Sequence, residues 1–136
     1  MSINQDVLKE FVSEEHMVLD TTEIDETLFM LDVSSDLNVT QKMILQFDGG
    51  VLLISGQVCG IDEASPGDVL MAMLNVGTVF GLRILGEEGP FCISHCLVLE
   101  DAGKADLRFA ILSLAVATGD VRKELGIGGM FMGMMD

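Results

Sequence analysis

Two cysteines and a histidine lie close together in segment 91–99, FCISHCLVL, as Cys92, His95 and Cys96. Thiolate and imidazole are the ligands that structural zinc prefers, and a thiol beside an imidazole can act as a nucleophile. Either kind of site requires the side chains to converge on one point. The secondary structure of this segment therefore decides between a reactive site and a structural role.

The apolar run that holds these residues follows the glycine-rich segment 86–90, which is typical of the second strand of a hairpin. Because side chains alternate along a strand, Cys92 and Cys96 share one face and His95 points to the other. A zinc site also needs about four converging ligands, and Cys59 and His16 are too scattered in sequence to complete one. We therefore expect no metal or other cofactor, and cysteines that behave as small buried apolar residues. His95 is expected to be a core or interface histidine.

Other catalytic arrangements are not supported either. Burial in an acidic protein raises the pKa of a thiol and makes it a poor nucleophile. The many carboxylates fall in expected loops and on helix surfaces, and the glycines at 49–50 and 86–89 join strands, whereas phosphate-binding loops lead into a helix. We expect that the protein is not an enzyme.

The charge balance excludes several classes of partner. The 136 residues include 22 acidic and 7 basic ones, for a net charge of −15. Nucleic acid and membrane surfaces are excluded as partners because phosphate binding needs clustered lysine and arginine. Residues 1–36 alone hold ten carboxylates and one base, Lys9. This acidic segment fits either a basic partner or a solvated surface that keeps the protein soluble.

Three features predict a cytoplasmic protein. No basic region precedes an apolar stretch near residue 1, which argues against a secretory signal. The longest helical apolar run, 109–117, is far shorter than the roughly 20 residues of a membrane span. Three cysteines are an odd number, which argues against a disulfide framework.

The periodicity of apolar residues predicts an α+β fold in the order α-β-β-β-α-β-β-α, with a mainly antiparallel five-stranded sheet packed with three helices. The clearest local signals are the hairpin turn at 48–50 and the helix start at Ser65, Pro66 and Asp68. The last helix is apolar nearly all round over 109–117, which predicts the most buried helix, lying across the sheet. The helices are expected at 4–17, from 65 and at 104–125, and the strands at 28–33, 42–47, 51–58, 78–85 and 91–99.

One domain is expected over residues 1–125, followed by a tail at 126–136 that is rich in glycine and methionine. The tail has no clear period. It can dock on its own domain, bind a partner or be disordered.

The order of elements, together with VLMAMLN at 69–75, FGLRILGEEGPFCISHCLVLED at 80–101 and ADLRFAILSLAVATGDVRKELG at 105–126, resembles the type III secretion chaperone-like superfamily, which includes YbjN-type and CesT-type domains. The resemblance covers about residues 4–125. It implies an acidic cytoplasmic homodimer without cofactor or catalysis that binds another polypeptide, held as an extended segment against apolar patches of its sheet and first helix. The tail is outside the family pattern.

Alternation along the first expected strand suggests where a partner would bind. Phe29, Leu31 and Val33 form its core stripe, so Leu28 and Met30, with Ile44 on the next strand, are the candidate partner-facing residues. The alternative is that these three pack beneath a helix. The functions that remain open are a chaperone-like or adaptor protein, a YbjN-type regulatory module without an extended client, and a small-ligand-binding domain or unrecognised enzyme.

Overall fold

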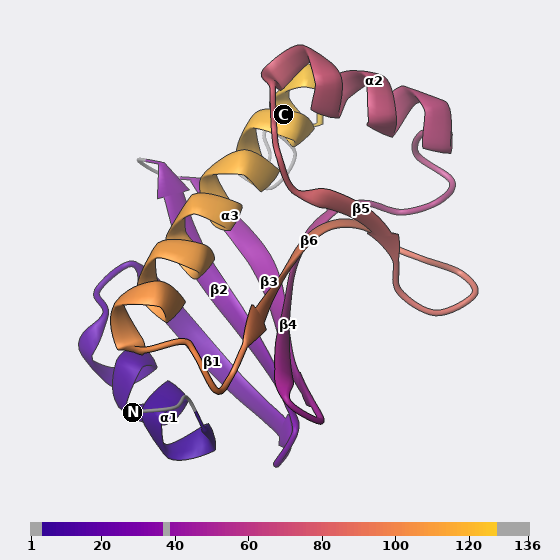
Figure 1. Cartoon of the computed structure of the whole chain (residues 1–136). Coiled ribbons are helices and arrows are strands. Elements are labelled where there is room, and N and C mark those ends of the chain that lie inside the picture. Colours follow the sequence, from indigo (N-terminus) through magenta and orange to yellow (C-terminus); the bar gives the residue numbers. More distant parts are fainter. Residues whose placement is uncertain (1–3, 37–38, 128–136) are drawn as a thin grey trace.

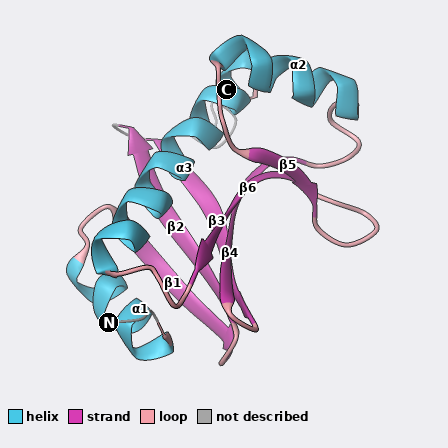
Figure 2. Cartoon of the chain, viewed as in Figure 1, coloured by secondary structure: helices cyan, strands magenta, loops and turns pink. Residues whose placement is uncertain are grey.

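A computed structural model describes residues 4–36 and 39–127, and within them three helices lie against an antiparallel sheet of six strands (Figures 1 and 2). The elements in chain order are α1 (Gln5–Glu14), β1 (Val18–Asp25), β2 (Leu28–Asp36), β3 (Val39–Asp48), β4 (Val51–Cys59), α2 (Pro66–Val76), β5 (Gly81–Ile84), β6 (Phe91–Val98) and α3 (Lys104–Glu124).

The strands lie in the order β1-β2-β3-β4-β6-β5, so the first four form a meander and β6 inserts between β4 and β5. The expected α+β class and antiparallel sheet are confirmed, but the expected five strands and the order α-β-β-β-α-β-β-α are wrong. The sequence analysis missed β1, which lies at a sheet edge and is exposed at every residue after Val18. A strand exposed on both faces has no buried side to impose an apolar alternation.

Helices α1 and α3 lie on the same side of the sheet, and α2 packs near the C-terminal end of α3 (Figure 1). α3 crosses β2, β3, β4 and β6 as expected. Phe29, Leu31 and Val33 are buried beneath these helices, which confirms the predicted core stripe. The core therefore lies between one face of the sheet and the helices.

Local sequence signals placed two boundaries correctly. Gly49, with a φ of +63°, turns the chain between β3 and β4, where Asp48 pairs with Val51. Ser65 and Asp68 form the predicted reciprocal cap at the start of α2.

α3 holds more buried residues than α1 or α2, which confirms the prediction that it is the most buried helix, but the sheet covers it on one side only. Its inward face, which includes Leu107, Ile111 and Leu114, is completely buried. Phe109 is nevertheless 73% exposed, and Val116 is also exposed. A single sheet can cover only one side of a helix, so the outward apolar residues stay in contact with water.

Residues 128–136, which make up most of the predicted tail, lie outside the described residues. The chain before them is held in place, because the Ile127 N–H donates to the Arg122 carbonyl over 2.9 Å. Among the described helices, none is both long and apolar enough to cross a membrane.

Candidate functional site

An open groove of about 460 Å³ lies between α3 and the connection from α2 to β5. One wall is a stripe of α3 that contains Phe109, Ser113, Val116 and Asp120. The other wall is formed by residues 76–80, and His95 of β6 contributes to the lining. We call this feature the α3 groove.

The end of α2 fixes the loop wall of the α3 groove. Gly77 adopts a left-handed conformation with a φ of +72°, which ends the helix, and its N–H donates to the Leu74 carbonyl. The next N–H, of Thr78, donates to the Met73 carbonyl. This closure directs Val79 outward, where the residue is 91% exposed.

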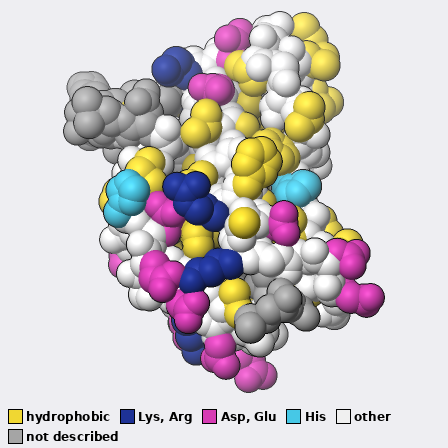
Figure 3. All heavy atoms as spheres, turned by 60° about the vertical axis from the view of Figure 1, so that its left-hand side comes forward, with side chains coloured by type: hydrophobic (Ala, Val, Ile, Leu, Met, Phe, Trp, Pro, Cys, Tyr) yellow, Lys and Arg dark blue, Asp and Glu magenta, His cyan; other side chains and the backbone are white. Residues whose placement is uncertain are grey.

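Apolar side chains continue from the α3 groove onto the outer face of α2. Leu70, Met71 and Leu74 are all exposed there, Leu74 to 73%. Figure 3 shows hydrophobic side chains gathered on this side of the molecule, from its upper part, where α2 lies, to its centre. Exposed apolar residues that are clustered rather than scattered mark interaction sites.

Two ionisable residues line the α3 groove. The ring of His95 packs edge-on against Phe80, with 5.5 Å between the ring centroids. Asp120 lies in the stripe of α3, eleven residues after Phe109. All lining residues belong to the described part of the chain, and none of them is lysine or arginine.

The three residues predicted to face a partner lie elsewhere. Met30 of β2 pairs directly with Ile44 of β3, and Leu28 lies two residues from Met30 on the same face. Because Phe29 and Leu31 point toward the helices, this is the opposite face of the sheet. Leu28, Met30 and Ile44 are half-buried, and helices α1 and α3 lie on the other side of the sheet (Figure 1). None of the three lines the α3 groove.

The same outer sheet face is polar toward its other edge. The hydroxyls of Ser55 and Ser94 are 2.8 Å apart, and Arg83 donates to Ser55 over 3.4 Å. The outer face is therefore mixed in character, whereas the exposed surface around the α3 groove is mainly apolar.

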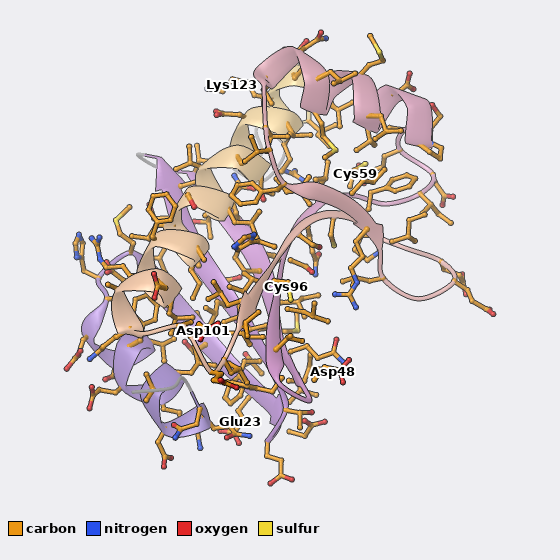
Figure 4. All side chains as sticks on the ribbon, in the orientation of Figure 1. Glu23, Asp48, Cys59, Cys96, Asp101 and Lys123 are labelled. Carbon is orange, nitrogen blue, oxygen red and sulfur yellow. The ribbon has the colours of Figure 1, made fainter. Side chains whose placement is uncertain are left out.

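The cysteines do not form a reactive cluster. Burial raises the pKa of Cys92 to about 12, although the charge of Arg83 lowers it slightly. Burial also raises the pKa of Cys59, and the nearby Glu63 carboxylate raises it further. Cys96 is exposed on the sheet, far from Cys59 in Figure 4, so the prediction of a buried thiol is wrong for this residue.

His95 and Cys96 point to opposite faces of β6, as predicted: His95 contacts Phe80 on the helix side, and Cys96 is paired in register with Leu53. Over the described residues, no group of three His, Cys, Asp or Glu side chains is placed to hold a metal ion.

Among the carboxylates whose burial the structure describes, the most buried, that of Glu15, has a structural role. Burial would raise the pKa of Glu15, but hydrogen bonds from the Met17 N–H and from Arg108 outweigh this effect and lower it. The Arg108 Nε donates to Glu15 over 2.8 Å and so joins the end of α1 to α3. A carboxylate held in its charged form by an arginine is a poor candidate for a general acid.

Comparisons of the chain with protein-family models, with curated proteins and with solved structures find no match. We therefore infer a function from the residues of the groove.

Sequence reasoning missed the α3 groove because its walls are separated by about thirty residues of sequence. Phe109 was assigned to the buried helix, and Val79 was assigned to a strand. One signal was available: an apolar run that surrounds a helix offers more apolar surface than one sheet face can cover.

Proposed function

We propose that this protein is a non-catalytic protein-binding domain, chaperone-like or adaptor-like, that holds a segment of another polypeptide in the α3 groove. The observation that carries the proposal is the exposure of Phe109 and Val79 on opposite walls of one groove. Removing such side chains from water contributes about 25 cal/mol per Å² of apolar surface. The resemblance to the type III secretion chaperone-like superfamily supports the same class of function.

Neither Phe109 nor Val79 is needed to complete the hydrophobic core. The buried face of α3 is complete without Phe109, and Val79 lies in a loop that is closed by backbone hydrogen bonds. Burial of both side chains by a bound partner would explain why apolar residues stand at these exposed positions. A cytoplasmic location belongs to this proposal and is supported by the three free cysteines, which suit a reducing compartment.

A photo-cross-linking amino acid at position 109 tests the proposal. The matched control carries the same group at position 19, because Leu19 is also an exposed apolar residue, at 59%, but lies on β1. A third site, position 44, tests the different partner contact that the sequence predicted at Leu28, Met30 and Ile44, and cross-linking from there but not from position 109 would contradict the proposal. A protein captured from position 109 is then purified, and its binding to the intact chain is measured.

The proposal predicts that Phe109→Ser weakens this binding at least tenfold, because a central aromatic residue contributes about 2 kcal/mol or more to an interface. Leu19→Ser should leave the affinity unchanged. Equal cross-linking from positions 19 and 109, or an affinity that is unaffected by Phe109→Ser, contradicts the proposal.

A second candidate is a YbjN-type regulatory module that acts as a homodimer without an extended client. The exposed row of Leu70, Met71 and Leu74 on α2 favours it, since a helix face of this kind can pack against a second copy. Light scattering after size exclusion should then give a dimer for the natural chain and for Leu19→Asp, and a monomer for Leu74→Asp. A monomeric natural chain contradicts the homodimer.

A further inference from the structure

The backbone of the α3 groove limits what kind of segment can occupy it. An extended segment leaves its own N–H and C=O groups in need of partners, which an open strand edge normally supplies. One wall of the groove is α3, whose backbone groups bond within the helix. In the other wall, the N–H groups of Gly77 and Thr78 donate to α2, and that of Phe80 donates to the Thr78 hydroxyl. These two walls therefore offer no row of backbone groups, and an extended chain would have to pair with the edge of β6 from His95 to Val98, which β5 leaves open beside the groove.

A helix does not need such a row, because its backbone hydrogen bonds are internal. The wall residues Phe109, Ser113, Val116 and Asp120 follow the four- and three-residue spacing that keeps side chains on one helix face. The stripe extends about 16 Å along α3 at 1.5 Å per residue. A bound helix of about three turns has the same length and can place apolar residues at i, i+3 or i+4, and i+7 against it.

The negative charge at the α3 groove favours a partner segment of positive charge. Asp120 contributes a negative charge to the lining, and the protein as a whole carries −15. The two bases that precede Phe109 on α3 are already engaged by carboxylates in or just after α1: Arg108 by Glu15, and Lys104 by Glu10 and Glu14. Lys123, one turn beyond Asp120, lines a separate small cavity together with it. This field attracts a basic segment and repels an acidic one.

We infer that the occupant of the α3 groove is a basic amphipathic helix of about three turns in a partner protein, with its apolar face on Phe109, Val116 and Val79 and a lysine or arginine near Asp120. This inference rests on the proposed function and specifies the partner. It differs from the extended segment that the family resemblance implies.

Three fluorescent synthetic peptides of fourteen residues test the inference. The first has leucine at helical spacing with lysine elsewhere, the second has the same composition with leucine and lysine alternating, and the third is the first with glutamate in place of lysine. Fluorescence anisotropy with the full chain measures their affinities at about 0.15 M salt, where long-range attraction between exposed charges is largely screened. Circular dichroism of the first peptide reports any helix formed on binding.

The helical basic peptide is expected to bind at least tenfold more tightly than the alternating one and to gain helix on binding, and the acidic peptide is expected not to bind. Phe109→Ser should weaken the binding of the helical basic peptide at least tenfold, and Asp120→Asn should weaken it several-fold. Leu19→Ser should have no effect.

Tighter or equal binding of the alternating peptide that still depends on Phe109 overturns the helical inference and leaves the proposed function intact. Binding of the helical peptide that is insensitive to Phe109→Ser also overturns it, because the attraction is then not at the α3 groove. If none of the peptides binds while position 109 still cross-links to a partner, the inference fails alone. If position 109 captures no partner either, the proposed function fails with it.

Discussion

Gly56 of β4 lies directly against Thr118 of α3: a Cβ placed on Gly56 would stand 2.0 Å from the Thr118 hydroxyl oxygen and 3.0 Å from its Cβ. Thr118 is completely buried, and its hydroxyl donates to the Leu114 carbonyl over 2.7 Å. The helix that forms one wall of the α3 groove therefore depends on a glycine in the strand beneath it.

Gly56→Ala should destabilise the fold by about 2–3 kcal/mol, because overpacking a core forces neighbouring side chains and backbone to move. Urea denaturation measures the loss. Gly81→Ala is the matched control, since Gly81 also lies in a strand but has nothing within 4 Å of an added Cβ, and it should stay within about 0.5 kcal/mol of the natural chain.

Adding Thr118→Ala to Gly56→Ala should recover at least about 1 kcal/mol, the coupling expected of residues in contact. Strict additivity of the two substitutions would contradict the contact.

Arg122 should contribute much more to the free energy of unfolding than the adjacent Lys123. It is buried, and its guanidinium donates to the carbonyls of Val58 and Ile127, which joins the end of α3 to β4 and to the chain that follows. Burial lowers the pKa of Arg122 to about 10, so the side chain is still charged at neutral pH. Arg122→Met should cost about 2 kcal/mol by removing charge-assisted hydrogen bonds. Lys123→Met, the adjacent exposed base, should change the free energy of unfolding by less than about 0.5 kcal/mol.

The Glu15–Arg108 pair should make stability depend on pH in the acid range. The pKa of Glu15 is lowered in the folded protein from an ordinary value of 4.5. The stabilisation is therefore fully present above that value and is lost as the pH falls through the folded pKa. Since Arg108 is 57% exposed and solvent screens the pair, Glu15→Gln should cost about 1 kcal/mol or less at pH 7. The free energies of unfolding of the two chains, taken from denaturation curves, should converge as the pH falls below the lowered pKa of Glu15, and a constant difference across the pH range would contradict this assignment.

One thiol should react much faster than the other two. Cys96 is exposed, whereas Cys59 and Cys92 are buried and have raised pKa values. Because the thiolate is the reactive form, a colorimetric thiol reagent at pH 8 should label one cysteine of the native chain rapidly. Cys96→Ser should abolish this rapid phase, and labelling of all three thiols in denaturant provides the control. A rapid phase that persists in Cys96→Ser would show that one of the other two cysteines is accessible.

The sequence predicted those parts of the fold in which the conformation favoured by neighbouring residues is also the one that tertiary packing requires. The reciprocal cap at Ser65 and the turn at Gly49 depend on residues close in sequence, and the stripe of Phe29, Leu31 and Val33 follows from alternation on a half-buried strand. β1 has no such pattern: its apolar residues Leu19 and Ile24 are both exposed, so burial imposes no periodicity on it.

The α3 groove could not be predicted because it depends on how two distant segments meet. The exposure of Phe109 is set by which side of α3 the sheet covers, and that of Val79 by the left-handed end of α2. Composition and periodicity describe each segment alone, whereas the cavity between them arises from tertiary packing.

The exposed outer edge of β1 bears on the solubility of the protein. Its unpaired backbone groups, beside the exposed Leu19 and Ile24, form a template on which another strand can add. Asp20, Glu23 and Asp25 place negative charges along that edge, and equal charges on two molecules keep their edges apart. Near the isoelectric point of about 4.1 the net repulsion between molecules vanishes. A pH near this isoelectric point should therefore favour edge-to-edge aggregation of an otherwise folded protein.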